Sequence, residues 1–198
     1  MFAESIQIKP RRHVSIQRFH EVHAGLFTDK PLGSVLLLPV NAYIKNNGKA
    51  VMAKNCGLVA KQRFRGIDLS WGRELQIQGR QIGNRGMFKT EAVGNYPAII
   101  WKRPGDTVKR AKDPTIVACP TMWHFVEQAD LSLIERSCSV IVDMADYYRW
   151  TNIYAPRLGT GQGRRDWATE IKPILMDYFD ERFTICYPFS EESSGLLK

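Results

Sequence analysis

The stretch from Ser34 to Val40 places the tightest restriction on the fold. It reads SVLLLPV, a short apolar run bounded by Gly33 and Asn41. A run of this kind without a polar face is typical of a strand covered on both sides, as in a parallel or mixed sheet with helices on each face. The sequence therefore predicts an α/β fold around this strand.

Strands and helices alternate along the rest of the chain. Further strands are predicted at 115–120, 152–155 and 183–187. Helices are predicted at 55–64, at 130–142 and after Asp166, which offers an N-cap, with a kink at Pro173. This alternation predicts a three-layer α/β/α sandwich that binds ligands at the carboxyl ends of its strands.

The 198 residues suffice for one α/β domain and are few for two. No linker or repeat divides them, so we expect a single domain over 1–198, with 1–13 and 190–198 as peripheral extensions. No apolar run approaches the roughly 20 residues that span a bilayer, and the first 20 residues lack the apolar segment of a secretion signal. We expect a cytoplasmic protein with no membrane partner.

Cysteine and charge patterns narrow the expected ligands. The four cysteines form no CxxC pair and have no histidine beside them at zinc-finger spacing, so neither a metal nor a cofactor is expected. The net charge is +8, which attracts phosphates of a nucleotide or a nucleic acid. The basic residues occur in short groups, among them Arg11-Arg12 and Arg164-Arg165, and no block is long enough to predict a basic tail.

The segment from Pro156 to Trp167, PRLGTGQGRRDW, carries the strongest functional signal. Three glycines, Gly159, Gly161 and Gly163, alternate with Thr160 and Gln162 between a predicted strand and a predicted helix. Backbone without side chains can approach a ligand closely and direct several N–H groups at phosphate oxygens. We interpret the segment as a phosphate-binding loop.

This loop resembles the second ligand loop of macro domains, in particular of the hydrolases that remove ADP-ribose from glutamate or from DNA bases. Three further segments resemble family motifs in the required order. Val40-Asn41-Ala42 is similar to a Val-Asn signature whose asparagine contacts the distal ribose. Residues 51–58, including Met52 and Lys54, are similar to the first ligand loop, and 119–125, CPTMWHF, to a Phe-Pro-Thr-Lys-x-His-Trp segment. The resemblance covers about 33–187 and implies a macro-domain-like mixed sheet.

The chain also departs from the family pattern at positions that affect ligand binding. Family members place an aspartate that holds the adenine amino group where this chain has Gly25, although Asp29 is near. Two glycines of the first loop are replaced by Ala53 and Asn55, which adds bulk where the diphosphate would lie. An insertion at 43–49 lengthens the approach to that loop.

The catalytic groups of the deglycosylating relatives are missing. Met122 stands in place of the lysine and Gly163 in place of an aspartate, and neither side chain can attack an anomeric carbon. The candidates that could substitute are Asn41, Lys54 and His124, the last as an acid or base near neutral pH. A polar amide at the end of an apolar strand favours a pocket-facing role for Asn41.

Three functions follow. The first is binding of ADP-ribose or a related NAD-derived nucleotide, as a reader of ADP-ribosylated protein or nucleic acid, through Asn41, Met52, Lys54 and residues 159–163. The second is hydrolysis of an ADP-ribosyl linkage or of ADP-ribose 1″-phosphate by non-standard catalytic residues. The third is nucleic-acid binding by the basic surface. The glycine loop favours the first two, and the missing lysine favours the first over the second.

Overall fold

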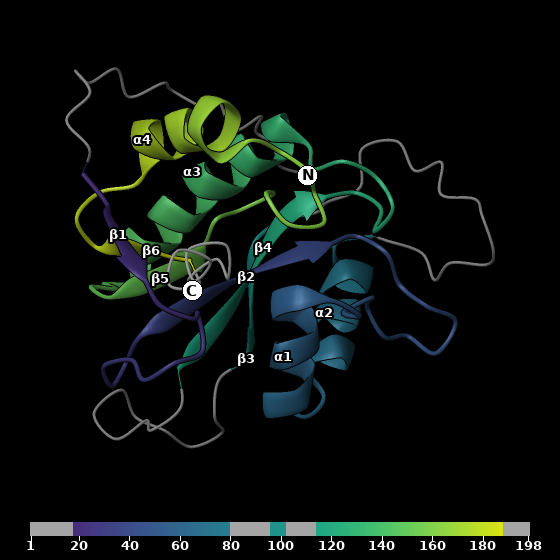
Figure 1. The fold of residues 1–198 in the computed structure, drawn as a ribbon. Coiled ribbons are helices and arrows are strands. Elements are labelled where there is room, and N and C mark those ends of the chain that lie inside the picture. Colours follow the sequence, from purple (N-terminus) through teal and green to yellow (C-terminus); the bar gives the residue numbers. More distant parts are fainter. Residues whose placement is uncertain (1–17, 80–95, 102–113, 188–198) are drawn as a thin grey trace, which may run out of the picture.

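A computed structural model describes residues 18–79, 96–101 and 114–187 (Figure 1). Its centre is one six-stranded sheet in the order β1-β6-β5-β2-β4-β3. The strands are β1 (His20–His23), β2 (Val35–Asn41), β3 (Ala98–Trp101), β4 (Thr115–Met122), β5 (Ile153–Pro156) and β6 (Phe183–Tyr187). β3 pairs with β4 in the antiparallel sense and all other neighbours are parallel, so the sheet is mixed.

Helices cover both faces of this sheet, which confirms the three-layer prediction. Figure 1 shows α1 (Asn55–Arg63) and α2 (Ile67–Ile77) on one face. The other face carries α3 (Leu131–Tyr148) and α4 (Lys172–Tyr178), the latter preceded by a π-helical turn, η1 (Trp167–Ile171). The connections between parallel neighbours therefore run through helices, as parallel pairing requires.

The alternation of side chains along β2 divides the core into two halves. Val35 and Leu37 pack with α3 and α4, whereas Leu36, Leu38 and Val40 pack with α1 and α2. All five side chains are nearly inaccessible to solvent. Burial on both faces is the reason that this strand is apolar at consecutive positions rather than at alternate ones.

The start of the predicted C-terminal helix is built as the sequence indicated. Asp166 caps it, because its Oδ1 accepts a hydrogen bond from the Thr169 N–H at 2.7 Å. The Ile171 N–H bonds the Asp166 carbonyl at 3.1 Å, five residues back, which widens the first turn into η1. Pro173 follows in the first turn of α4, so the chain changes from π-helical to α-helical geometry close to the predicted kink.

Three elements are absent from the sequence-based prediction. β1 is a short, largely exposed edge strand, HEVH, with no apolar alternation to reveal it. β3 has only four residues. In α2, Ile67, Trp71 and Leu75 are fully buried at helical spacing, but Gly72 in its interior weakens the local helix signal.

Gly72 is required by packing: a Cβ at this position would lie 2.0 Å from the Gly48 carbonyl oxygen. Gly48 belongs to the turn of the predicted insertion 43–49, where Ile44 and Ala50 form an antiparallel bridge. The insertion is therefore a compact turn that packs on α2.

The expected extensions 1–13 and 190–198, and with them Arg11 and Arg12, lie outside the described residues. No helix in the described part of the chain is long and apolar enough to cross a membrane.

Candidate functional site

A cavity of about 920 Å³ opens at the edge of the sheet where the parallel strands end. The last residues of β1, β2, β4, β5 and β6 contribute to its wall, together with the loop before α1 and the glycine loop after β5. The cavity thus lies at the carboxyl ends of the strands, as the alternating pattern predicted. Its wall contains all the predicted ligand-binding residues: Asn41, Met52, Lys54, Gly159, Thr160, Gly161, Gln162 and Gly163.

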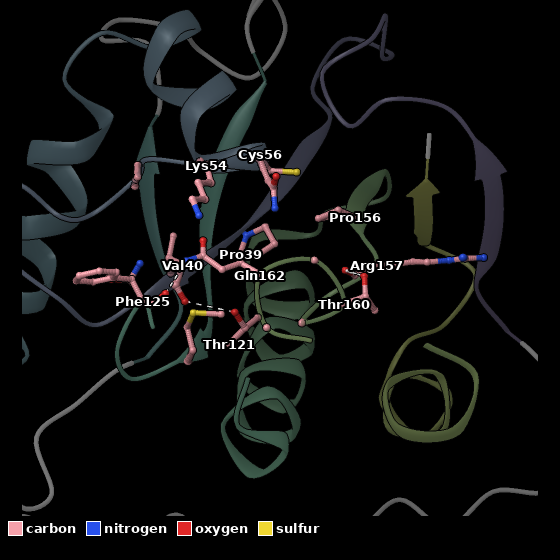
Figure 2. A pocket seen from close by; sticks show the side chains of 18 of the residues that line it. Pro39, Val40, Lys54, Cys56, Thr121, Phe125, Pro156, Arg157, Thr160 and Gln162 are labelled. Atoms are coloured by element: carbon pink, nitrogen blue, oxygen red, sulfur yellow. Dashed lines mark hydrogen bonds between the residues drawn. The ribbon is translucent and has the colours of Figure 1, made fainter. Parts of the chain in front are cut away.

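The loop before α1 forms one side of the cavity. Lys54 stands at the N-cap of α1, and its side chain points into the cavity (Figure 2). Asn55 adopts a left-handed backbone conformation, with φ of 47°. Asparagine tolerates this conformation better than most non-glycine residues, so the loop keeps a glycine-like path where the resemblance expects glycine.

The glycine loop forms the opposite side, and its three glycines have different surroundings. Gly159 has a φ of 69°, and a Cβ there would lie 3.0 Å from Ile134. A Cβ on Gly163 would lie 2.5 Å from the Gly159 carbonyl oxygen and 2.6 Å from the Ala129 Cβ. Only the Gly161 position faces across the cavity, where a Cβ would meet the Asn55 side-chain nitrogen at 3.0 Å. The two loops therefore approach each other at Gly161 and Asn55.

Backbone N–H groups are available on both sides. Among the described residues, none accepts a hydrogen bond from the N–H groups of residues 159–163. The first intrahelical bond of α1 joins the Leu58 N–H to the Lys54 carbonyl, so the N–H groups that begin α1 have no intrahelical acceptor. Unpaired N–H groups at a helix N-terminus and in a glycine loop are suited to bind an anion.

Side chains from the glycine loop tether it to segment 124–129. Gln162 donates from Nε2 to the Phe125 carbonyl at 2.6 Å. Arg165 donates from Nε to the Ala129 carbonyl at 2.7 Å and forms an ion pair with Glu170 at 2.9 Å. Arg165 is therefore part of the scaffold of the loop, whereas the neighbouring Arg164 is exposed.

Asn41 faces the cavity and also braces its wall. Its Nδ2 donates to the Val51 carbonyl at 3.0 Å, and its Oδ1 accepts from the Tyr43 N–H at 3.0 Å. The Trp71 indole donates to the Asn41 carbonyl at 2.8 Å. The side-chain amide thus ties the end of β2 to the approach to the first loop, a structural role that sequence analysis did not anticipate.

The catalytic candidates occupy different places. Lys54 lies in the cavity, and its side-chain ammonium group has no hydrogen-bond or ion-pair partner among the described residues. Met122 lies in the wall at the end of β4, 8% exposed. His124 is outside the wall: its ring stacks on Phe125 with centroids 4.3 Å apart and meets Tyr43 edge-on at 4.9 Å.

Sequence analysis missed the wall formed by β1 and β6. His23 and Tyr187, with ring centroids 4.1 Å apart, line this side of the cavity together with Cys186, and Cys56 lies in the first turn of α1. Burial raises the pKa of the Cys56 and Cys186 thiols, which makes them weak nucleophiles. They carry no sequence motif, and only the meeting of the carboxyl ends of the strands at one edge of the sheet brings them to the cavity.

In the described part of the wall, no carboxylate replaces the adenine-binding aspartate that the family pattern places at Gly25. Gly25 lies in the loop after β1, and Asp29 is exposed and does not line the cavity. None of the described residues that form the wall is acidic, while Lys54 and Arg157 are basic. No group of three or more His, Cys, Asp or Glu side chains within the described ranges could hold a metal ion.

Comparison of the structure with solved structures gives matches to macrodomains. The macrodomain of Mycobacterium tuberculosis DarG is 18% identical, with a TM-score of 0.59 over 86% of this chain and 98% of that one. The macrodomain of Thermus aquaticus DarG is 19% identical, with a TM-score of 0.61 over 86% and 98%.

A third match, Thermosipho africanus DarTG in complex with ADP-ribose, is 18% identical, with a TM-score of 0.65 over 91% of this chain but only 44% of that one. No protein-family model matches the sequence, and no curated protein is detectably similar to it. The chain therefore has the macrodomain fold, at a sequence identity that establishes the fold alone.

Proposed function

We propose that the cavity binds ADP-ribose or a closely related NAD-derived nucleotide, and that the protein acts as a reader of this group. One observation carries the proposal: two loops with unpaired N–H groups, the start of α1 and residues 159–163, face each other across one cavity. A diphosphate between them would accept hydrogen bonds from both sides and lie at the positive end of the α1 dipole.

The size and charge of the cavity support this ligand. Its volume of about 920 Å³ is in the range of small-molecule and cofactor sites. None of the described residues in its wall is acidic, and its two basic side chains are Lys54 and Arg157, the latter also paired with Glu21 at 3.4 Å. This balance of charge suits an anionic ligand. A protein of the same fold, the Thermosipho africanus DarTG, has been solved in complex with ADP-ribose.

Calorimetry with ADP-ribose tests the proposal. We expect a dissociation constant in the micromolar range, about 7–9 kcal/mol of binding free energy. Gly161→Glu should abolish binding without unfolding the domain, because its side chain would enter the space between the loops and carry a like charge toward the phosphates. The nearest atom to the new Cβ is the end of the flexible Asn55 side chain, which can move aside.

Leu32→Glu is the matched control. Leu32 is 73% exposed and lies just before β2, at the amino-terminal edge of the sheet, opposite the cavity. The Leu32→Glu variant adds the same charge away from the site and should leave the affinity for ADP-ribose unchanged. Equal binding by the wild type and Gly161→Glu would show that the ligand does not lie between these loops.

A second candidate, hydrolysis, is supported by the amine of Lys54 inside the cavity. We expect no removal of ADP-ribose by a lysine at the end of β4, since Met122 occupies that place and Gly163 has no room for a side chain. Losing a positioned acid–base group costs roughly 10²–10⁴-fold in rate. Any linkage cleavage would then depend on Lys54, Asn41 or, after a movement of its loop, His124.

The assay offers three substrates: ADP-ribosylated glutamate, ADP-ribosylated single-stranded DNA and ADP-ribose 1″-phosphate. Binding without turnover of any of them is the expected result and leaves a reader. Turnover of the phosphate ester alone would indicate a phosphatase. Robust turnover of either of the first two, unaffected by Lys54→Ala and His124→Ala, would contradict this assignment of the site.

The partners and location follow from the same chemistry. We propose that the nucleotide is attached to a protein or to a nucleic acid. The net charge of +8 attracts nucleic acid, which is therefore also a candidate for an independent ligand. The four cysteines are all unpaired, which suits the reducing cytoplasm.

A further inference from the structure

The two sides of the cavity differ in chemistry. The strand order places the ends of β2 and β4 on one side and those of β1 and β6 on the other. The first side carries the polar side chains of Asn41 and Thr121, which suit the hydroxyl groups of a sugar. The second carries the rings of His23 and Tyr187, whose centroids are 4.1 Å apart. Planar rings suit the base of a nucleotide, so we call this second side the nucleoside end.

Arg157, the residue that follows the alanine of β5 and Pro156, belongs to the wall of the nucleoside end. Figure 2 shows its side chain extending away from Phe125. The carbon of its guanidinium group lies 4.0 Å from the centre of the Tyr187 ring and 5.0 Å from the centre of the Trp167 ring. Contacts of this kind use the face of the guanidinium group and hold it in place without using its N–H groups.

Most of these N–H groups have no acceptor. Within the described part of the chain, Nη2 of Arg157 donates to Glu21 at 3.4 Å, whereas Nε and Nη1 have no partner. Nε is buried, but Nη1 is not, and 33% of the side chain is exposed. A planar guanidinium group that is fixed by stacking and has unpaired outer N–H groups can donate two parallel hydrogen bonds to a phosphate.

The charges around Arg157 leave an excess of one positive charge. Glu21 accepts the shorter contact from Lys172, at 2.6 Å, so a single carboxylate is shared by two cations. This carboxylate is outside the wall, and its side chain is only 15% exposed. None of the described residues of the wall is acidic. An anionic group at the nucleoside end would therefore meet positive charge that is only partly compensated.

We propose that the nucleoside end binds a phosphate group on the ribose that carries the base, and that Arg157 recognises this group. The preferred ligand is then ADP-ribose 2′-phosphate, the NADP-derived counterpart of ADP-ribose. The proposal rests on the proposed function, nucleotide binding by this cavity. Arginine side chains accommodate the same 2′-phosphate in dinucleotide-binding folds, where they distinguish NADP from NAD.

The test compares ADP-ribose with ADP-ribose 2′-phosphate by calorimetry. The wild type should bind the 2′-phosphate about tenfold more tightly, because hydrogen bonds between two charged groups are stronger than neutral ones. Arg157→Met keeps an apolar stem between the rings and removes the charge, and should bring the two affinities together. Arg157→Lys keeps the charge but cannot donate two parallel hydrogen bonds, and should retain only part of the preference.

Two controls separate recognition by Arg157 from general attraction of anions. Arg73→Met removes the same charge from an exposed arginine of α2 outside the wall and should leave the wild-type preference unchanged. ADP-ribose 1″-phosphate carries its additional phosphate on the other ribose. Its affinity relative to ADP-ribose should be the same in Arg157→Met as in the wild type.

Equal affinities of the wild type for ADP-ribose and its 2′-phosphate, or tighter binding of ADP-ribose, would overturn the proposal even if the Arg157 variants fail to fold. A preference for the 2′-phosphate that survives in folded Arg157→Met would overturn the role of Arg157. Binding of neither ligand by the wild type would instead overturn the proposed function, and this inference with it.

Discussion

The three glycines of the glycine loop have different structural roles, although the sequence pattern does not distinguish them. Gly159 packs against Ile134 of α3, Gly163 packs against Gly159 and Ala129, and any side chain at Gly163 would overlap backbone atoms. Gly161 alone has its free side toward the cavity. Two of the three glycines are therefore needed to form the loop, and the third to admit a ligand.

Gly163→Ala should destabilise the domain more than Gly161→Ala. The new Cβ at position 163 would lie 2.5 Å from the Gly159 carbonyl oxygen, so backbone must move, and we expect a loss of about 1–3 kcal/mol of unfolding free energy. At position 161 the Cβ meets only the end of the Asn55 side chain, and the expected change is within about 0.5 kcal/mol. Urea denaturation of both variants measures the difference; equal stabilities would show that the loop can relax.

Among the elements, the edge strand β1 carries a cluster of ion pairs at its centre. β1 is short and mostly exposed, and among the described strands it pairs only with β6. Glu21 at its centre joins it to Arg157, just after β5, and to Lys172, the first residue of α4. Burial alone would raise the pKa of Glu21, but hydrogen bonds and charges of Lys172 and Arg157 outweigh it and lower the pKa below its ordinary value of 4.5.

This shift predicts how stability depends on pH. A carboxyl whose pKa is lower in the folded state stabilises the fold above its unfolded value of 4.5, and this contribution is lost as the pH falls through the folded value. Wild type should therefore lose more stability than Glu21→Gln between pH 6 and pH 3, about one to two units either side of 4.5. Thermal melts across this range give the comparison. Parallel losses in both proteins would mean that Glu21 does not hold β1 in place.

The whole molecule carries a net charge of +8, but part of that charge is committed to the fold. Arg165 and Arg182 are held by carboxylates, Arg165 by Glu170 and Arg182 by Asp146 and Asp180. The charge of Arg165 is thus less available to a polyanion than the sequence suggested, whereas Arg164 beside the cavity is exposed.

If nucleic acid is a partner, binding of single-stranded DNA should weaken steeply with salt, because each neutralised phosphate releases counterions. Arg164→Ala should reduce the slope of log K against log salt by about 0.7 for each phosphate that the arginine neutralises. Arg73→Ala, an exposed arginine on α2 on the other side of the sheet, is the control and should leave the slope unchanged. Gel shifts with no complex even at low salt would remove nucleic acid as an independent ligand.

The sequence by itself determined the layers of the fold and the place of the ligand loop. The run at 34–40, the helix cap at Asp166 and the strand–glycine–helix order at 153–172 are local patterns, and local backbone preferences produced the same elements in the structure. The ends of the parallel strands then had to meet at one edge, which brought Asn41 and the glycine loop to a common cavity.

Tertiary structure decided the roles of single side chains. The Asn41 amide binds backbone ten residues away, and His124 stacks on Phe125 outside the cavity wall. β1 pairs with the distant strand β6, and its Glu21 finds partners 136 and 151 residues further along the chain. Such contacts depend on distances through space, which periodicity and spacing along the chain do not encode.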